Sequence, residues 1–101
     1  MPNRSLKVIN FEKNRIGPKV SLLQAIADYI AQDDIVLEFL FLSHNKIVGP
    51  GLAKLGDALK TNRSLKKLNL SYNLIDEAGL KEFSDGLREN YFLEELDLKN
   101  N

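Results

Sequence analysis

Alternating apolar and polar positions form one short phrase that recurs along the chain. In its most complete copy, Leu65, Leu68 and Leu70 are separated by polar residues, and Asn73 and Ile75 follow. Apolar residues on every second position are typical of a β-strand with one buried face. The phrase therefore predicts a strand that ends in a turn occupied by the asparagine.

The asparagine of this phrase falls at four positions, with steps of 31, 28 and 28 residues between them: Asn14, Asn45, Asn73 and Asn101. A fixed period of this length indicates a repeat array. We expect three complete units and one partial unit, at about residues 6–36, 37–64, 65–92 and 93–101. An asparagine amide can bond the open backbone groups of its own turn and those of the next unit. Four asparagines at matched offsets therefore predict a ladder of hydrogen bonds through the array.

The stretches that follow each asparagine have the period of an α-helix. Three apolar positions recur on one face of each predicted helix: Leu23, Ile26 and Ile30, then Leu52, Leu55 and Leu59, then Leu80, Phe83 and Leu87. Asp76 is the predicted N-cap of the third helix, and Ser21 to Gln24 has the pattern of a capping box in the first. Gly51 and Gly79 share one offset from their asparagines, which predicts a close approach between loop and strand.

The phrase Leu-x-x-Leu-x-Leu-x-x-Asn-x-Ile, followed by a helix and a step of 28 residues, resembles the leucine-rich repeat, specifically its ribonuclease-inhibitor-like subclass. Residues 73–83 and 45–55 are the segments most similar to that subclass. The resemblance implies an α/β solenoid of right-handed β-α repeats, with a parallel sheet on the concave face and helices on the convex face. It also implies a single domain over residues 1–101. Proteins similar in this way include the ribonuclease inhibitor, Ran GTPase-activating proteins and tropomodulin-like actin-capping proteins.

The last unit has no helix, and no polar capping unit is visible in the sequence. Repeat units bury their apolar edges on one another, so terminal units normally have polar caps. This favours a fragment of a longer array. The alternative is a short protein whose open ends associate with another chain.

Composition narrows the function classes. Lys and Arg number 14, as do Asp and Glu, so the net charge is zero and bulk electrostatics favour neither nucleic acid nor an anionic membrane. No apolar run approaches the roughly 18 residues that a membrane span needs. The chain has no cysteine, which fits a reducing compartment and a cytoplasmic location.

Reactive residues are few. His44 is the only histidine, and its place beside a ladder asparagine predicts a surface loop rather than a general base. Without cysteine or a second histidine, no transition-metal site has a candidate ligand set. Gly49-Pro-Gly51 lacks the Lys-Ser/Thr ending of a phosphate-binding loop. We therefore expect no enzyme activity, no metal site and no cofactor.

The residues between the inward leucines project onto the predicted concave face. In the second unit these are Phe39 and Phe41, which form an apolar patch with Val8 where the other units have mostly polar residues. Exposed aromatics inside a charged rim are typical of protein-binding surfaces. The predicted binding residues are Val8, Phe39, Phe41, Lys67, Asn69, Glu95 and Asp97. The alternative is an apolar strand whose rings lie flat on neighbouring side chains or are covered by a segment outside this sequence.

The preferred function is a non-catalytic module that binds a protein partner through the concave face, with no nucleic acid or membrane partner. One alternative is a GTPase-activating regulator of the Ran kind, which would present an asparagine or arginine to a nucleotide-bound partner; no residue here can be assigned that role. The other is a structural module that associates with itself through its open ends.

Overall fold

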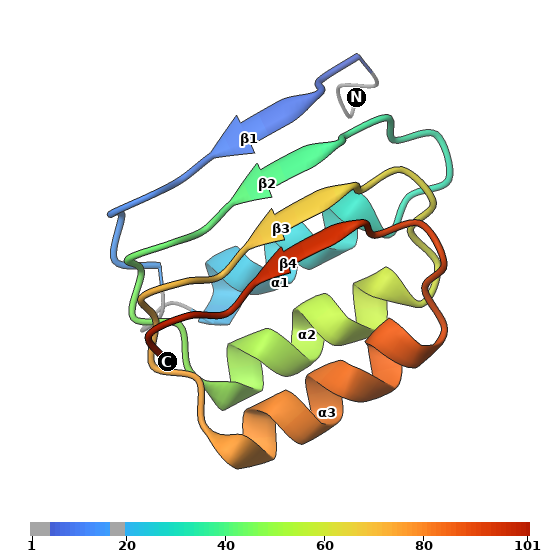
Figure 1. Ribbon diagram of the computed structural model, residues 1–101. Coiled ribbons are helices and arrows are strands. Elements are labelled where there is room, and N and C mark those ends of the chain that lie inside the picture. The colour runs from blue at the N-terminus through green and yellow to red at the C-terminus, as the bar shows by residue number, and fades with distance from the viewer. Residues whose placement is uncertain (1–4, 17–19) are drawn as a thin grey trace.

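The computed structural model describes residues 5–16 and 20–101. Residues 1–4 and 17–19, which belong to the predicted domain, lie outside the described residues. Strands and helices alternate along the chain: β1 (Val8–Asn10), α1 (Val20–Ile30), β2 (Phe39–Phe41), α2 (Gly49–Leu59), β3 (Lys67–Asn69), α3 (Glu77–Arg88) and β4 (Glu95–Asp97). Figure 1 shows the strands side by side in one layer, with the helices side by side in a second layer.

The sheet has the strand order β1-β2-β3-β4, and every pair is parallel. Val8 pairs with Phe39, Phe39 with Lys67, and Lys67 with Glu95. These partners are 31, 28 and 28 residues apart, the same steps that separate the asparagines. The units therefore stack in one constant register, and the predicted α/β repeat architecture is confirmed.

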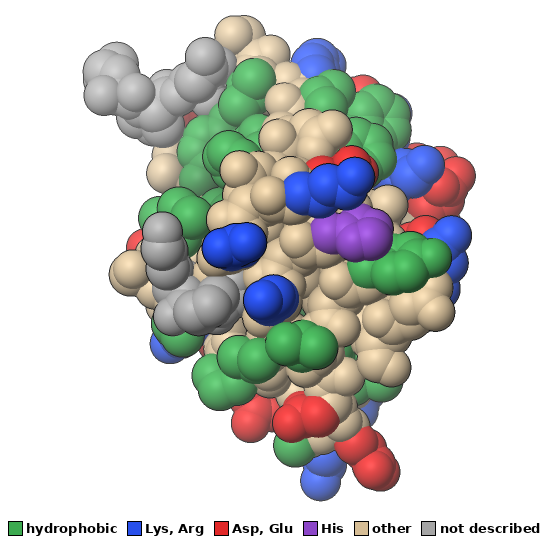
Figure 2. Space-filling view, turned by 90° about the vertical axis from the view of Figure 1, so that its left-hand side faces the viewer, with side chains coloured by type: hydrophobic (Ala, Val, Ile, Leu, Met, Phe, Trp, Pro, Cys, Tyr) green, Lys and Arg blue, Asp and Glu red, His purple; other side chains and the backbone are tan. Residues whose placement is uncertain are grey.

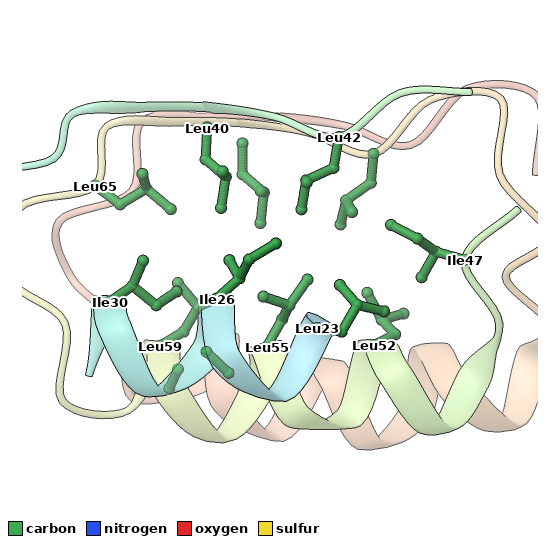
Figure 3. Close-up of a cluster of buried hydrophobic side chains, with 14 of the residues drawn as sticks. Leu23, Ile26, Ile30, Leu40, Leu42, Ile47, Leu52, Leu55, Leu59 and Leu65 are labelled. Atoms are coloured by element: carbon green, nitrogen blue, oxygen red, sulfur yellow. The ribbon is translucent and has the colours of Figure 1, made fainter. Parts of the chain in front are cut away.

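The core fills the space between the sheet and the helices (Figure 3). Leu40 and Leu42 point from the second strand region toward the helices, and both side chains are fully buried. The predicted apolar faces of α1 and α2 meet them, and all six residues of those two faces are buried: Leu23, Ile26, Ile30, Leu52, Leu55 and Leu59. At about 1.5–3 kcal/mol for each buried aliphatic side chain, this layer is the main source of stability.

The outermost units are less buried than the sequence pattern predicts. Leu80 repeats the position of the fully buried Leu52, yet it is 39% exposed. Leu6 and Phe11, which repeat the positions of the fully buried Leu37 and Leu42 in the next unit, are also exposed. The reason is geometric, because among the described residues nothing packs beyond α3 or beyond β1.

The predicted asparagine ladder is present at the ends of the strands. The side-chain oxygen of Asn73 accepts from the backbone N–H groups of Asn45 and Ile47, at 2.9 and 3.1 Å. Its amide nitrogen donates to the carbonyl oxygens of Leu42 and Leu70, at 3.0 and 2.9 Å. The amide also donates to the Ser71 carbonyl at 3.2 Å, so one side chain joins two units through five backbone groups, and it is itself 5% exposed.

The other ladder members repeat this scheme as far as their neighbours allow. Asn45 bonds Asn14 and Ile16 in the first unit, and the Asn101 oxygen accepts from Ile75 at 3.1 Å. Asn14 begins the ladder, and its amide donates to the Glu12 carbonyl at 3.0 Å from an exposed position.

A second ladder, which the sequence analysis missed, lies at the opposite end of the strands. The Asn62 amide donates to the Ile30 carbonyl at 2.8 Å, and its oxygen accepts from the Leu65 N–H at 2.8 Å. Asn90, 28 residues later, donates to the Leu59 carbonyl at 2.9 Å. Each side chain links the end of the helix one unit earlier to the residues just before the next strand.

Glycines bring α2 and α3 into backbone contact. A β-carbon on Gly79 would overlap Gly49, and one on Gly86 would overlap the Gly56 carbonyl. Gly51 instead faces the Leu23 side chain of α1. The predicted close approach of loop and strand at Gly51 and Gly79 is therefore wrong, since the close approach joins helices.

The two predicted caps have different outcomes. Asp76 caps α3 as expected, since its carboxylate accepts from the Gly79 N–H at 2.8 Å. Ser21 is wrong as a cap, because it lies inside α1. The Gln24 side chain donates to Asp28 at 2.7 Å, one turn further along the helix.

Replacing the central ladder residue should be costly. Asn73→Ala removes all the bonds of the Asn73 side chain and leaves buried backbone groups without partners, at about 1–3 kcal/mol each. We expect the free energy of unfolding, measured by urea titration, to fall by at least about 3 kcal/mol. Asn14→Ala is the matched control and should cost less than about 1 kcal/mol, because the Asn14 side chain is exposed and makes a single hydrogen bond to the described residues. Equal losses in the two variants would refute the ladder as the main link between units.

Gly86→Ala tests the contact between α2 and α3, because the contact determines whether the change raises or lowers the free energy of unfolding. In an isolated helix this change is favourable by about 1 kcal/mol. Here the added methyl group meets the Gly56 backbone, so we expect unfolding to become easier by about 1–3 kcal/mol. Glu82→Ala, an exposed site in the same helix, should change stability by less than about 0.5 kcal/mol. A stabilising Gly86→Ala would show that the helices are further apart.

Candidate functional site

The helices cover one face of the sheet and leave the opposite face to solvent (Figure 1). We call this uncovered face the outer face; it is the face predicted to be concave. Successive residues of a strand point to opposite sides, so Leu40 enters the core while Phe39 and Phe41 lie on the outer face. The same alternation in β3 places Lys67 and Asn69 on the outer face.

The strand register brings all the predicted binding residues together. One row across the sheet consists of Val8, Phe39, Lys67 and Glu95, and the next consists of Asn10, Phe41, Asn69 and Asp97. The two phenylalanines therefore lie side by side within β2. Val8 flanks them on one side, and the charged residues of β3 and β4 flank them on the other.

The phenylalanines are less exposed than the sequence analysis expected. Both are half-buried, whereas Val8 is 46% exposed. Lys67 covers part of the patch, because its ammonium group lies 5.9 Å from the centroid of the Phe41 ring. A cation over an aromatic face at this distance is a weakly favourable contact. The patch is thus a shallow apolar surface with one edge beneath a lysine.

The position of Phe41 has a structural role in the other units. Asn10, Asn69 and Asp97 each accept a hydrogen bond from the backbone N–H two residues later, at 3.0 Å in every case. This bond ends the strand in an Asx turn. Phe41 occupies the same place and has no oxygen with which to make the bond. The fold therefore favours a short polar residue here, and the second unit departs from that preference.

Two predicted binding residues are thus partly committed to the fold. Asn69 accepts from both the N–H and the hydroxyl group of Ser71, and Asp97 accepts from the Lys99 N–H. Lys67 and Glu95 make no such bond to the backbone of the described residues, so their side chains can meet a partner. Their charged groups form an ion pair with each other at 3.4 Å.

A row of charged residues just before the strands also borders the patch, and the sequence analysis missed it. The Glu38 carboxylate lies 3.6 Å from the ammonium groups of both Lys7 and Lys66. The sequence does contain a signal for this row, because residues of alternating charge stand at the matched position just before each strand. These pairs hold the start of β2 between its neighbours, next to Phe39.

The strand-to-helix turns form one edge of the outer face, and Figure 2 views the molecule from this side. His44 lies there beside the ladder asparagine and is exposed, as predicted. Its ring stacks on Tyr72, with centroids 4.3 Å apart and planes 9° apart. The Lys99 ammonium lies 5.9 Å from the Tyr72 ring centroid on the same edge.

Within residues 5–16 and 20–101, no cluster of His, Cys, Asp or Glu has the composition and spacing to hold a metal ion. Over the same residues, no helix is both long enough and apolar enough to cross a membrane. What the described chain offers at the outer face is a surface of mixed apolar and charged character.

Comparisons with known proteins agree on the fold. The family model described as Leucine Rich repeat matches residues 61–84, which span β3 and most of α3. Leiomodin-1 Actin-Binding Site 2 (ABS2) is similar over 99% of this chain, with a TM-score of 0.87 and 19% identity. The tropomodulin C-terminal domain of Caenorhabditis elegans is similar over 99% of this chain, with a TM-score of 0.83 and 16% identity. The chain therefore has a leucine-rich repeat fold.

The chain spans 57% and 59% of the lengths of those two structures. No curated protein sequence matches it significantly. The assignment to the ribonuclease-inhibitor-like subclass stays a prediction.

The ion pair beside the patch should contribute little to folding. The Lys67 and Glu95 side chains are 39% and 68% exposed, and exposed pairs are typically worth about 0.2–1 kcal/mol. We expect Lys67→Gln to lower the free energy of unfolding by less than about 1 kcal/mol in a urea titration. A double-mutant cycle with Glu95→Gln isolates the pair. A coupling well above 1 kcal/mol would mean that these charges hold the sheet together and are not free to meet a partner.

Proposed function

We propose that this chain is a non-catalytic protein-binding module and that a partner docks on the outer face over Phe39 and Phe41. The observation that supports this most directly is the residue at position 41. Three units place an Asn or Asp there and make an Asx turn, whereas the second unit has a phenylalanine that cannot. A side chain that the fold does not favour, on a face that the helices leave open, is best explained by an external contact.

The surroundings of the patch fit this proposal. Interfaces commonly have an apolar centre and a polar rim, and aromatic residues near the centre contribute much of the affinity. Phe39, Phe41 and Val8 supply the centre, and Lys67 and Glu95 supply part of the rim. The proposal treats residues 1–101 as one leucine-rich repeat domain, since one register runs through all four strands.

Actin is the first partner to test. One of the similar structures is described as an actin-binding site of leiomodin-1, and its fold superposes on nearly the whole of this chain. The 19% identity supports the fold, so actin binding is proposed here as a candidate. The GTPase-activating and self-associating alternatives stay predictions.

The double variant Phe39→Ser/Phe41→Ser tests both the surface and the partner. If actin binds at the outer face, we expect its affinity to fall at least about tenfold, because central aromatic contacts are commonly worth about 2 kcal/mol or more. Co-sedimentation with actin filaments and fluorescence titration with actin monomers measure the change. Circular dichroism before and after thermal unfolding checks that the variant is folded.

Tyr91→Ser/Phe92→Ser is the matched control, because it removes two exposed aromatic residues that lie outside the patch. It should bind as the unaltered chain does. Unchanged binding by a folded Phe39→Ser/Phe41→Ser variant would refute the outer face as the docking surface. No binding of either form of actin by the unaltered chain would exclude actin as the partner.

A further inference from the structure

Basic side chains gather on the strand-to-helix turns of the first two units. Lys13 and Arg15 flank the ladder residue Asn14, and His44 and Lys46 flank the next ladder residue. All four are exposed. We call these four residues the basic edge. On this side of the molecule, Figure 2 shows Lys and Arg side chains, in blue, around the histidine, in purple.

The backbone presents these side chains from rigid turns. Lys13, Arg15, His44 and Lys46 all have positive φ angles, of 61°, 53°, 58° and 55°. This region is uncommon for residues other than Gly, and Asn, Asp and His are the most frequent exceptions. Asn100, which repeats the position of Lys13, has a φ of 59°, so the fold accepts an asparagine there. The turn geometry therefore does not require the basic residues.

The turns are also fixed by hydrogen bonds. The Lys13 N–H donates to the Ser43 carbonyl and the His44 N–H to the Ser71 carbonyl, both at 3.1 Å. The His44 ring is held further by its stack on Tyr72. Little conformational freedom of the main chain is lost when a ligand meets such an edge, which favours binding.

Among residues 5–16 and 20–101, no carboxylate forms an ion pair with Lys13, Arg15 or Lys46. By contrast, Lys66 and Lys67, on the sheet, pair with glutamates at 3.6 and 3.4 Å. Adjacent turns of a parallel sheet are about 4.8 Å apart, so these cations lie near one another. They favour an anionic ligand.

The basic edge continues the apolar patch. His44 follows Phe41 by three residues, so the two lie on the order of 10 Å apart along the strand direction. From the apolar patch and this charge complementarity, we propose that the partner contributes an extended polypeptide segment in which apolar residues are followed by acidic residues. The apolar part lies over Phe39 and Phe41, and the acidic part lies along the basic edge. This inference rests on the proposed function and specifies the chemistry of the segment.

A polypeptide fits better than a nucleic acid. Tight binding to duplex DNA commonly involves about 6–10 phosphate contacts, whereas the basic edge offers four groups on two units. Beyond the patch, the outer face presents Glu95 and Asp97, which repel a phosphate backbone that crosses the sheet.

The test uses the full chain and a synthetic peptide with two leucines, a two-residue glycine-serine spacer and four glutamates. We expect binding in an NMR titration, with the largest amide shifts at Phe41, His44 and Lys46. Affinity should fall at least threefold between 50 and 200 mM salt, because charge contacts of exposed groups are screened. A peptide with lysines in place of the glutamates should bind at least tenfold more weakly.

Charge reversal locates the contact. Lys13→Glu/Lys46→Glu should lower the affinity for the glutamate peptide at least fivefold. The milder change Lys13→Gln/Lys46→Gln should lower this affinity at least twofold. Lys54→Glu/Lys81→Glu, on exposed positions of the helices, makes the same charge change and should have no effect. Circular dichroism confirms that each variant is folded.

The inference is overturned if the glutamate peptide does not bind, if the lysine peptide binds equally well, or if a single-stranded oligonucleotide binds more tightly at the same edge. The two proposals can fail separately. If Phe39→Ser/Phe41→Ser abolishes actin or peptide binding and charge reversal does not affect it, the docking surface stands and the acidic segment is wrong. If only charge reversal weakens binding, the basic edge stands and the apolar docking surface is wrong.

Discussion

The side-chain amide of Asn73 is the interaction on which the rest of the structure depends. Each strand ends in a turn, and the backbone groups of that turn that do not pair with the next unit need another hydrogen-bond partner. An amide has one acceptor and two donor hydrogens, and Asn73 uses all of them on backbone groups of two units. These bonds link the second and third units at the same register as the sheet, and residues with positive φ angles lie beside the ladder asparagines.

The ladder and the leucine core together determine where the chain can vary. Inward positions of the strands are filled by leucines, and the turns are held by asparagines, so neither tolerates much change. Outer-face residues are subject only to the local preference for an Asx turn. The second unit departs from that preference at Phe41. The same freedom lets the turns of the first two units hold basic residues where the backbone would accept Asn.

Most of the fold could be predicted from the sequence because it is repeated. The strand phrase, the ladder positions and the apolar faces of α1 and α2 each recur at matched offsets, and all of them are found where the pattern placed them. The second ladder was missed because Asn62 and Asn90 are its only two asparagines. The first unit has Asp34 at that offset, so the repetition was too weak to recognise.

The glycine contacts and the burial of Phe41 could not be predicted, because they depend on distances that a sequence pattern does not provide. Gly51 and Gly79 share an offset, yet one meets a side chain and the other meets a backbone. The partial burial of Phe41 depends on how Lys67 lies across its ring, which strand alternation alone does not show. The outer-face residues themselves were predicted correctly as neighbours because register follows directly from the repeat step.

The glycine contact between α2 and α3 also bears on the curvature of the molecule. Neighbouring strands lie about 4.8 Å apart, whereas packed helices usually lie 8–10 Å apart, and this mismatch bends a β-α solenoid into an arc. Gly49 lies against Gly79 and Gly56 against Gly86, so α2 and α3 approach closely, which favours a weaker bend between the second and third units. Between the first and second units, the Leu23 side chain lies between α1 and Gly51 of α2, which favours a stronger bend there. The uneven helix spacing thus predicts that the curvature of the outer face changes at β2, the strand that holds Phe39 and Phe41.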